Sequence, residues 1–244
     1  MPFESVLEGR KTPMSIGDRI CEKLATVVPG PLRVVLGNAG AAVCRLLLSR
    51  KRFIFRGKQY PYFFDGYKLT WMTERAIEVP IVKEFVGQFK GKEILEVGNV
   101  LCHYFAGSHD VVDKYERAPG VINADIVHFD PGKEYELIIS ISTLEHVGFD
   151  EEPKEPDKIQ KAVENLLRIL APGGKIVVTL PLGYNPDVDT LLESGWPELA
   201  DVYYLKKTSW MNEWAEVDAP SAFKAAAEGR FFWLNGIAVL EFDL

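Results

Sequence analysis

The sequence predicts an α/β protein with a Rossmann-like, mostly parallel sheet, helices on both faces and an N-terminal helical and lid extension. Short apolar runs of strand length alternate with segments of helical period from about residue 74 to the end. Several of these runs are rich in β-branched residues and show no polar alternation. Such runs are typical of strands covered on both faces, and strand–helix–strand alternation with short links predicts parallel pairing.

The first part of the chain shows a different pattern. Residues 1–60 predict an N-terminal helical extension, which Pro-Gly-Pro at 29–31 interrupts. The aromatic stretch that follows, with breakers at Pro61 and Gly66, is typical of a lid loop. We therefore divide the chain into an extension with an aromatic lid, residues 1–72, and a main domain, residues 73–244.

The main domain begins with a predicted helix from about Glu74, with Pro80 in its first turn and Gly91 after its end. Asp157 is the expected N-cap of a second helix that the Ala-Pro-Gly-Gly sequence ends. The expected strands cover 93–98, 110–116, 121–129, 136–142, 175–182 and 236–242, and the second helix covers 156–170.

Composition and charge restrict the classes of function. A net charge of −7 argues against nucleic acid as the main partner. Three widely spaced cysteines without a Cys-x-x-Cys pair predict reduced thiols and a cytoplasmic protein. Polar residues follow Met1 before any apolar run, which predicts no secretory signal.

One apolar segment, residues 34–48, is too short to span a membrane and is followed by a basic cluster at Arg50, Lys51, Arg52, Arg56 and Lys58. The segment is explained by a helix packed on the domain with a solvated basic edge. It is also explained by an interfacial element that makes peripheral contact with an anionic surface. The sequence leaves both interpretations open.

The first strand of the main domain ends in an incomplete glycine loop. Within Glu-Ile-Leu-Glu-Val-Gly-Asn-Val-Leu-Cys, only Gly98 stands where a dinucleotide loop needs a glycine, and Val100 and Cys102 replace the others. Their side chains disfavour a pyrophosphate against the backbone. An adenosine ligand without phosphates needs only one close approach to the backbone, which a single glycine allows.

These residues resemble the class I S-adenosylmethionine-dependent methyltransferases over roughly residues 73–244. Glu-Val-Gly at 96–98 is similar to the first motif, Val-Val-Asp at 111–113 to the second strand and Asn-Ala-Asp at 123–125 to the adenine-side motif. The stretch 140–148 is similar to the fourth-strand motif, and Leu-x-Pro-Gly-Gly follows in the same order. Some of these strings resemble sugar- and glycan-modifying members.

The resemblance implies S-adenosylmethionine as cofactor and assigns roles to individual residues. Glu96 would help orient the charged methionine end, directly or through water, Asp113 would accept from the ribose hydroxyls, and Asp125 would accept from the adenine amino group. The remaining implied cofactor residues are Gly98 and Asn99 in the turn, the Ile126 N–H at the adenine, and Ile141 and Ser142 beside the methionine. Each acid also has a structural explanation, as a helix cap, a solvated surface residue or a turn residue.

The expected chemistry is methyl transfer to a hydroxyl group. His146 is the candidate general base, because imidazole titrates near neutrality, and Glu145 would hold its tautomer or contact the acceptor. A purely structural role for this histidine remains open. Arg75, Tyr184 and Asn185 are the candidate acceptor ligands, and a sugar or glycan suits nearby aromatic and polar groups.

One further prediction and two alternative functions accompany this interpretation. No compact metal-ligand spacing is present, so we predict no metal. A catalytically inactive, methyltransferase-like scaffold or regulator is the main alternative function. A nicotinamide-dependent oxidoreductase is the third hypothesis, which the missing glycines disfavour.

Overall fold

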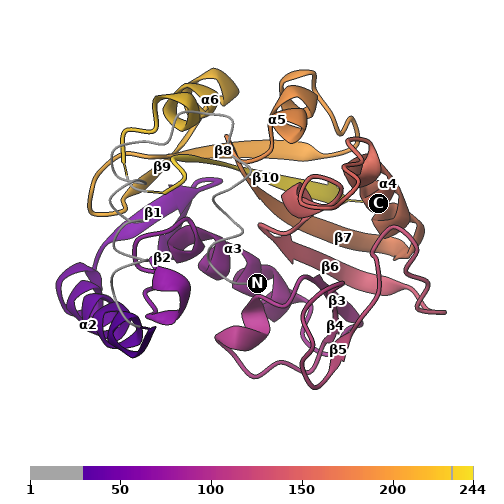
Figure 1. Ribbon diagram of the computed structural model, residues 1–244, viewed down its shortest axis with the longest axis horizontal. Helices are drawn as coiled ribbons and strands as arrows, with labels where there is room; N and C mark the ends of the chain where they lie inside the picture. Colours follow the sequence, from indigo (N-terminus) through magenta and orange to yellow (C-terminus); the bar gives the residue numbers. More distant parts are fainter. Residues whose placement is uncertain (1–29, 232, 244) are drawn as a thin grey trace.

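A computed structural model describes residues 30–231 and 233–243 of the chain. Its centre is an eight-stranded sheet with the strand order β5-β4-β3-β6-β7-β10-β8-β9 (Figure 1). The strands are β3 (Ile94–Val97), β4 (Asp110–Val112), β5 (Val121–Ile122), β6 (Tyr135–Ile141), β7 (Leu170–Pro181), β8 (Asp201–Lys207), β9 (Trp214–Val217) and β10 (Gly236–Asp243). Strands β5, β4, β3, β6 and β7 pair in parallel, and β10 pairs antiparallel with both β7 and β8. The predicted mostly parallel sheet is confirmed.

Helices cover both faces of this sheet, as the sequence predicts. On one face α4 (Lys158–Arg168), α5 (Pro186–Glu193) and α6 (Ala219–Glu228) contribute to a single apolar core with inward side chains of the strands. On the other face α3 (Arg75–Gln88) packs into a second core. Adjacent residues of β6 alternate between the two cores, with Ile138 in the first and Leu137 and Ile139 in the second. This double burial explains why the strand is apolar throughout.

The proline of α3 lies deeper in the helix than the sequence suggests. The helix begins at Arg75, so Pro80 stands in its second turn and not in the first. Proline has no N–H, which frees the carbonyl of Ala76 four residues earlier. The Phe63 N–H donates to that carbonyl at 2.9 Å, so the lid segment takes the place of the missing helical hydrogen bond.

Part of the predicted helical extension is a β-hairpin. After α2 (Gly30–Leu48), strands β1 (Arg52–Phe55) and β2 (Lys58–Pro61) pair antiparallel. Arg56 and Gly57 both have positive φ, at 51° and 73°, which matches a tight two-residue turn. The alternation of buried Phe53 and Phe55 with exposed neighbours suits a strand and not a helix. Residues 1–29 of the predicted extension lie outside the described residues.

The hairpin belongs to the second core. Phe53 and Phe55 are almost fully buried in the same cluster as Ile237 of β10. Arg56 also forms an ion pair of 2.6 Å with the buried carboxylate of Glu241 in that strand. The division of the chain at residue 72 stays a prediction.

Several predicted boundaries are wrong in detail. β4 ends at Val112, because the Asp113 carboxylate accepts from the N–H groups of Tyr115 and Glu116 and turns the chain. β5 ends at Ile122, and the residues after it form turns instead of the long predicted strand. Asp157 makes no side-chain cap to α4. β7 begins at Leu170 and includes the Ala-Pro-Gly-Gly sequence, with a register irregularity against β6.

Candidate functional site

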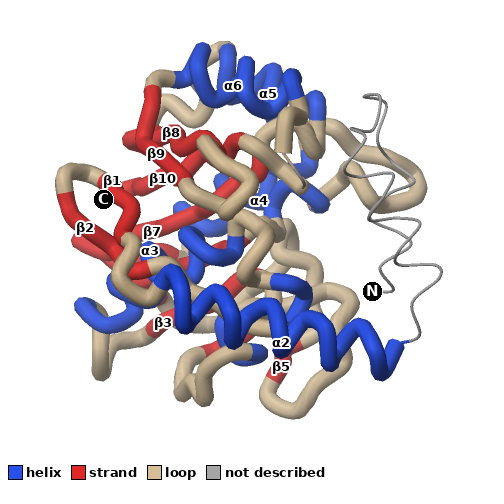
Figure 2. The backbone as a smooth tube through the Cα atoms, turned by 90° about the vertical axis from the view of Figure 1, so that its left-hand side faces the viewer, coloured by secondary structure: helices blue, strands red, loops and turns tan. Residues whose placement is uncertain are grey.

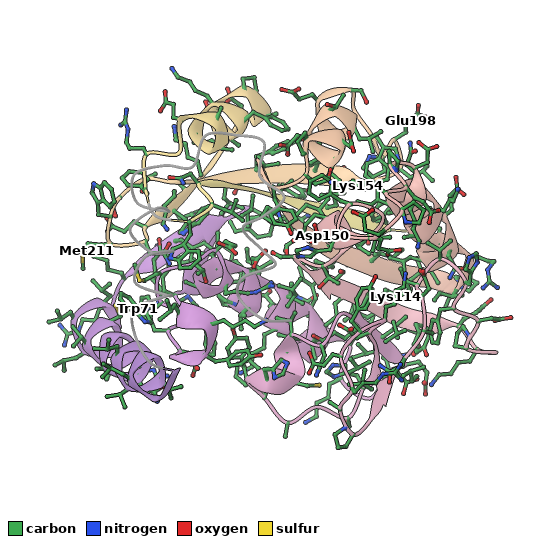
Figure 3. The ribbon with its side chains drawn as sticks, in the orientation of Figure 1. Trp71, Lys114, Asp150, Lys154, Glu198 and Met211 are labelled. Carbon is green, nitrogen blue, oxygen red and sulfur yellow. The ribbon has the colours of Figure 1, made fainter. Side chains whose placement is uncertain are left out.

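A cavity of about 590 Å³ opens at the carboxyl ends of β3, β4 and β6. The chain order reverses between β3 and β6, and ligands of open α/β sheets bind at such a reversal. Lys114 and Asp150, which come from different segments, border the same cavity (Figure 3). Its other lining residues are Tyr67, Lys68, Arg75, Val97, Gly98, Asn99, Val100, His103, Val112, Asp113, Tyr115, Glu116, Ala124, Asp125, Ile126, Ser142, Thr143, His146, Val147 and Glu151.

Gly98 forms the close turn at the end of β3, as the sequence predicts. Its φ is +84°, which a side chain rarely adopts. A Cβ placed there would lie 2.3 Å from the Thr143 Oγ1, so the residue must lack a side chain for a second reason. The single glycine therefore lets the ends of β3 and β6 approach each other beside the cavity.

Glu96 does not line the cavity. Its carboxylate is fully buried, and Oε1 accepts from the N–H groups of Val100 and Leu101 at 2.8 and 2.6 Å. Oε2 lies 2.7 Å from the His109 Nε2. The side chain therefore holds the loop after β3, and it explains how this loop keeps its shape without the missing glycines. The position differs from the cofactor contact that the resemblance implies.

Glu96, Cys102 and His109 form a group that could hold a metal ion. One ligand atom from each lies within 4.8 Å of the others. In the described structure the Cys102 Sγ also lies 3.8 Å from Glu96 and 3.9 Å from His109. Burial, followed by the charge of Glu96, raises the pKa of the Cys102 thiol to about 11, so the thiol is protonated at neutral pH. The three side chains satisfy one another by hydrogen bonding, and the prediction of no metal stays a prediction.

Asp113 occupies the end of β4 and borders the cavity. Its Oδ1 accepts from two backbone N–H groups, whereas Oδ2 has one long contact, 3.4 Å from the Asn99 N–H. Oδ2 therefore retains capacity to accept from a ligand hydroxyl. Asn99 lines the cavity as well, donates to Glu116 at 2.6 Å, and has a buried Oδ1 without a hydrogen-bond partner.

Asp125 lines the cavity, but cationic groups already surround it. Lys114 and Lys158 each lie 2.9 Å from its Oδ2, and the Val127 N–H donates to Oδ1. Although burial opposes ionisation, these donors lower the pKa of Asp125 to about 2. A ligand amino group would share this carboxylate with the lysines. The adjacent Ile126 is buried and lines the cavity, where it offers an apolar wall.

His146 lies between two carboxyl groups at the cavity wall. Its Nδ1 is 2.5 Å from the Asp150 Oδ2, and its Nε2 is 3.6 Å from the Glu145 Oε1. Burial disfavours the charged ring, but Glu145 and Asp150 outweigh it and raise the pKa of His146. Glu145 is almost completely buried, and burial raises its pKa to about 7. The carboxylate of Asp150 beside Nδ1 favours the neutral tautomer with hydrogen on Nδ1, in which Nε2 is the basic atom.

The sequence did not single out Asp150. The residue lies four positions after His146, a spacing that brings two side chains onto one side of a turn. The hydroxyl of Tyr184 donates to the same Oδ2 at 2.5 Å, and its ring contacts His146 edge-on. The histidine–acid spacing was the available signal. The sequence also did not identify Lys114 or Glu116 as neighbours of the cavity.

Arg75 and Ser142 come together at the base of the cavity. Arg75 forms an ion pair of 3.0 Å with buried Glu78, and the Ser142 hydroxyl donates to the same carboxylate at 2.5 Å. Ser142 has a φ of +37°, an uncommon conformation for a residue with a side chain. Ile141 is fully buried in the core beneath and does not line the cavity.

The two other predicted acceptor ligands do not line the cavity. Asn185 is buried, its oxygen accepts from the Asp187 and Val188 N–H groups at the start of α5, and its nitrogen donates to the Glu145 carbonyl. This side chain is a helix cap that supports the segment carrying His146. Tyr184 reaches the site through Asp150 and not through the cavity surface.

No protein-family model matches the sequence, and no curated protein matches it significantly. Among solved structures, the chain is similar to the N-methyltransferase NodS from Bradyrhizobium japonicum WM9 in complex with S-adenosyl-L-homocysteine. The identity is 14%, the match covers 70% of this chain and 86% of that chain, and the TM-score is 0.46.

Two further solved structures have the same kind of similarity. The sugar N-methyltransferase KedS8 from Streptoalloteichus is 20% identical over 42% of this chain and 47% of that chain, with a TM-score of 0.32. An rRNA methylase from Streptococcus thermophilus is 13% identical over 68% of this chain and 96% of that chain, with a TM-score of 0.42. Because every TM-score is below 0.5, these likenesses assign no activity or acceptor to this chain.

Proposed function

We propose that the protein is an S-adenosylmethionine-dependent methyltransferase that acts on a hydroxyl group of a small molecule, a sugar or glycan intermediate. The observation that supports this most is the meeting of Gly98, Asp113 and His146 around one cavity at the reversal of the sheet. These residues come from the ends of three different segments. The proposed cofactor groups and the proposed base thus share one space.

The cofactor would be held mainly by the β3 and β4 ends. The free capacity of the Asp113 Oδ2 suits a ribose hydroxyl, and the buried side chain of Ile126 suits an adenine face. Asn99, whose Oδ1 has no partner, is a further polar contact in this wall. Arg75 and Ser142 border the part of the cavity where the methionine end would lie.

His146 would take the proton of the acceptor hydroxyl as the methyl group moves. When bound, S-adenosylmethionine supplies an electrophilic methyl group on a sulfonium. Asp150 would hold the imidazole through Nδ1, so that Nε2 is the atom that receives the proton. Alignment of the two reactants in a site with little water would provide the rest of the acceleration.

A sugar suits the part of the cavity that the cofactor would leave open. Tyr67 and Tyr115 offer aromatic faces for a sugar ring, whereas Glu116 already accepts from Asn99 and Glu151 already pairs with Lys114 and Lys158. Tyr67 belongs to the predicted aromatic lid and stacks on His103 with ring centroids 4.7 Å apart. The free thiols of Cys44 and Cys102 suit a reducing, cytoplasmic compartment.

The first test is thermal unfolding with S-adenosylmethionine, S-adenosylhomocysteine and NAD. A ligand that binds only the folded protein raises the melting temperature. We expect a rise with the two sulfur compounds and none with NAD. A rise with NAD alone would instead support the oxidoreductase hypothesis, and no rise with any of them would support the scaffold.

The second test follows methyl transfer by mass spectrometry, with panels of sugars and nucleotide sugars as acceptors. We expect products heavier by one methylene unit on hydroxylated sugars, and a His146→Ala variant that binds S-adenosylhomocysteine normally but turns over far more slowly. If methylated products formed only with amino sugars, the proposed hydroxyl acceptor would be wrong, but the proposed methyltransferase activity would stand. Full turnover in His146→Ala would show that His146 is not the general base.

A further inference from the structure

Helix α2 presents an apolar face that no described part of the chain covers. Seven of its large apolar side chains are between 47% and 80% exposed, with Leu46 the most exposed. They are Leu32, Val34, Val35, Leu36, Val43, Leu46 and Leu47. Six of these, all except Val34, are spaced three, four or seven residues apart and so share one side of the helix. Exposed apolar patches of this kind mark interaction sites in soluble proteins.

The opposite side of α2 is fixed to the protein. Ala41, Cys44 and Leu48 are buried, and Gly40 lies so close to Trp71 that a Cβ would be 2.4 Å from its ring. Arg45 donates to the Phe64 carbonyl at 2.7 Å. The apolar face is therefore held outward by a well-packed helix. Figure 2 shows α2 lying along the outside of the molecule.

The sequence around this face is basic, but Arg45, Lys51, Arg56 and Lys58 each form an ion pair with an acid of another segment, namely Asp65, Glu213, Glu241 and Glu84. Residues 30–64 contain seven basic residues and no acidic residue, in a chain whose net charge is −7. The basic residues are Arg33, Arg45, Arg50, Lys51, Arg52, Arg56 and Lys58. Arg50 and Arg52, which directly follow the helix, are exposed. Apolar side chains next to the exposed Arg50 and Arg52 match the acyl boundary and the headgroups of an anionic lipid surface.

The helix would lie on such a surface and not cross it. Within the described residues no helix has the length and apolar character that a membrane span requires. A surface helix needs only one apolar face and basic flanks. We propose that α2 and the basic residues 50–58, here called the α2 platform, dock the protein on membranes that contain anionic lipids.

Docking would also set the direction of the proposed active site. Residues 59–66 connect the platform to Tyr67 and Lys68, which line the cavity. Asn38 of α2 contacts this segment closely at Gly66. Docking would therefore bring the Tyr67 edge of the cavity near the membrane surface.

The test is flotation of the full chain with vesicles of phosphatidylcholine alone or with one third phosphatidylglycerol. We expect binding to the anionic vesicles, weaker binding at high salt, and little binding to neutral ones. The double variant Leu46→Gln and Leu47→Gln removes two exposed apolar anchors and should reduce binding at least about tenfold. Arg50→Gln with Arg52→Gln should reduce it by about tenfold or more on anionic vesicles only.

Leu199→Gln is the matched control, because Leu199 is 65% exposed, like Leu47 at 66%, but lies outside α2. It should bind vesicles like the unaltered chain, and each variant should keep the melting temperature of the parent. Equal binding of all variants, or no binding to anionic vesicles, would overturn the proposal. Light scattering that shows a dimer, lost in the Leu46 and Leu47 variant without any vesicle binding, would assign the face to a second copy instead.

Discussion

His146 illustrates how neighbouring charges set the chemistry of one side chain. Two acids raise its pKa, so at neutral pH a larger fraction of the imidazole is protonated than in free histidine. A general base acts only in its neutral form. Activity should therefore increase as the pH rises through the raised pKa of His146, and it should level off above that pKa.

Replacing Asp150 tests this arrangement. In Asp150→Asn the ring loses a negative neighbour, so the pKa of His146 falls and the rise in turnover moves to lower pH. The level reached at high pH should fall about tenfold to a hundredfold, because Nδ1 is no longer held by a carboxylate. Turnover against pH, together with an NMR titration of His146, measures both effects.

Asp130→Asn is the control for this change, since Asp130 is exposed and is not among the residues that line the cavity. An Asp150→Asn enzyme with an unchanged pH profile and an unchanged His146 pKa would contradict a positioning role. Binding of S-adenosylhomocysteine should be the same in both variants.

Gly98 allows backbone strain and steric collision to be separated. Gly91 has nearly the same φ, +83°, but a Cβ there would meet nothing within 4 Å. Gly91→Ala should therefore cost about 1 kcal/mol from backbone strain alone. Gly98→Ala adds the collision with Thr143 and should cost about 3 kcal/mol or more, with loss of S-adenosylhomocysteine binding. Urea unfolding and calorimetry measure the two effects, and equal costs would show that the approach to Thr143 is unimportant.

At the scale of single elements, the β1–β2 hairpin is the largest addition to the predicted fold. Its inward aromatic side chains complete a core that also contains α3 and β10, and Phe55 packs edge-on against Tyr203 of β8. Although the hairpin precedes the main domain in the chain, it covers part of one face of the main sheet. It therefore contributes directly to the stability of the site scaffold.

Two adjacent residues of β1 test this contribution. Phe53→Ala removes a ring that is 2% exposed and should lower the free energy of unfolding by about 3–5 kcal/mol. Ile54→Ala, on the outward side of the same strand, should change it by about 0.5 kcal/mol or less. Chemical denaturation of both variants gives the comparison. A small effect of Phe53→Ala would mean that the hairpin is not part of the cooperative core.

The sequence predicts some elements better than others for physical reasons. Strands β3, β6 and β10 are buried on both faces, so each is a mostly apolar run that is easily recognised. β8 and β9 carry polar and exposed positions and escaped prediction, as did α5 and α6. The hairpin also escaped, because its alternation was short and was read together with the basic residues around it.

The candidate site was predictable where a residue lines the cavity directly. Gly98, Asp113 and His146 follow strand ends, and the order of the strands alone places such residues together. Glu96 and Asn185 were predicted to contact ligands, and in the structure their side-chain oxygens accept from backbone N–H groups. The sequence shows that an acid or amide stands at a strand end, but not whether the nearest unsatisfied donor belongs to a ligand or to the chain.

At the scale of the whole molecule, the two proposed activities lie on connected surfaces. The sheet carries the cavity at its carboxyl edge, and the α2 platform continues into the lid residues at the border of that cavity. In Figure 1, α2 lies at one side of the molecule, away from the helices α4, α5 and α6 that cover the opposite face of the sheet. Membrane docking and cofactor binding can therefore be altered separately.

Calorimetric titration of S-adenosylhomocysteine into the purified chain tests the proposed cofactor site most directly. We predict one site per chain, and at least about tenfold weaker binding in Asp113→Asn, because an amide replaces the carboxylate that would accept from the ribose hydroxyls. Asp130→Asn should bind like the unaltered chain. An absence of binding, or equal affinity in Asp113→Asn, would contradict adenosine recognition at the end of β4.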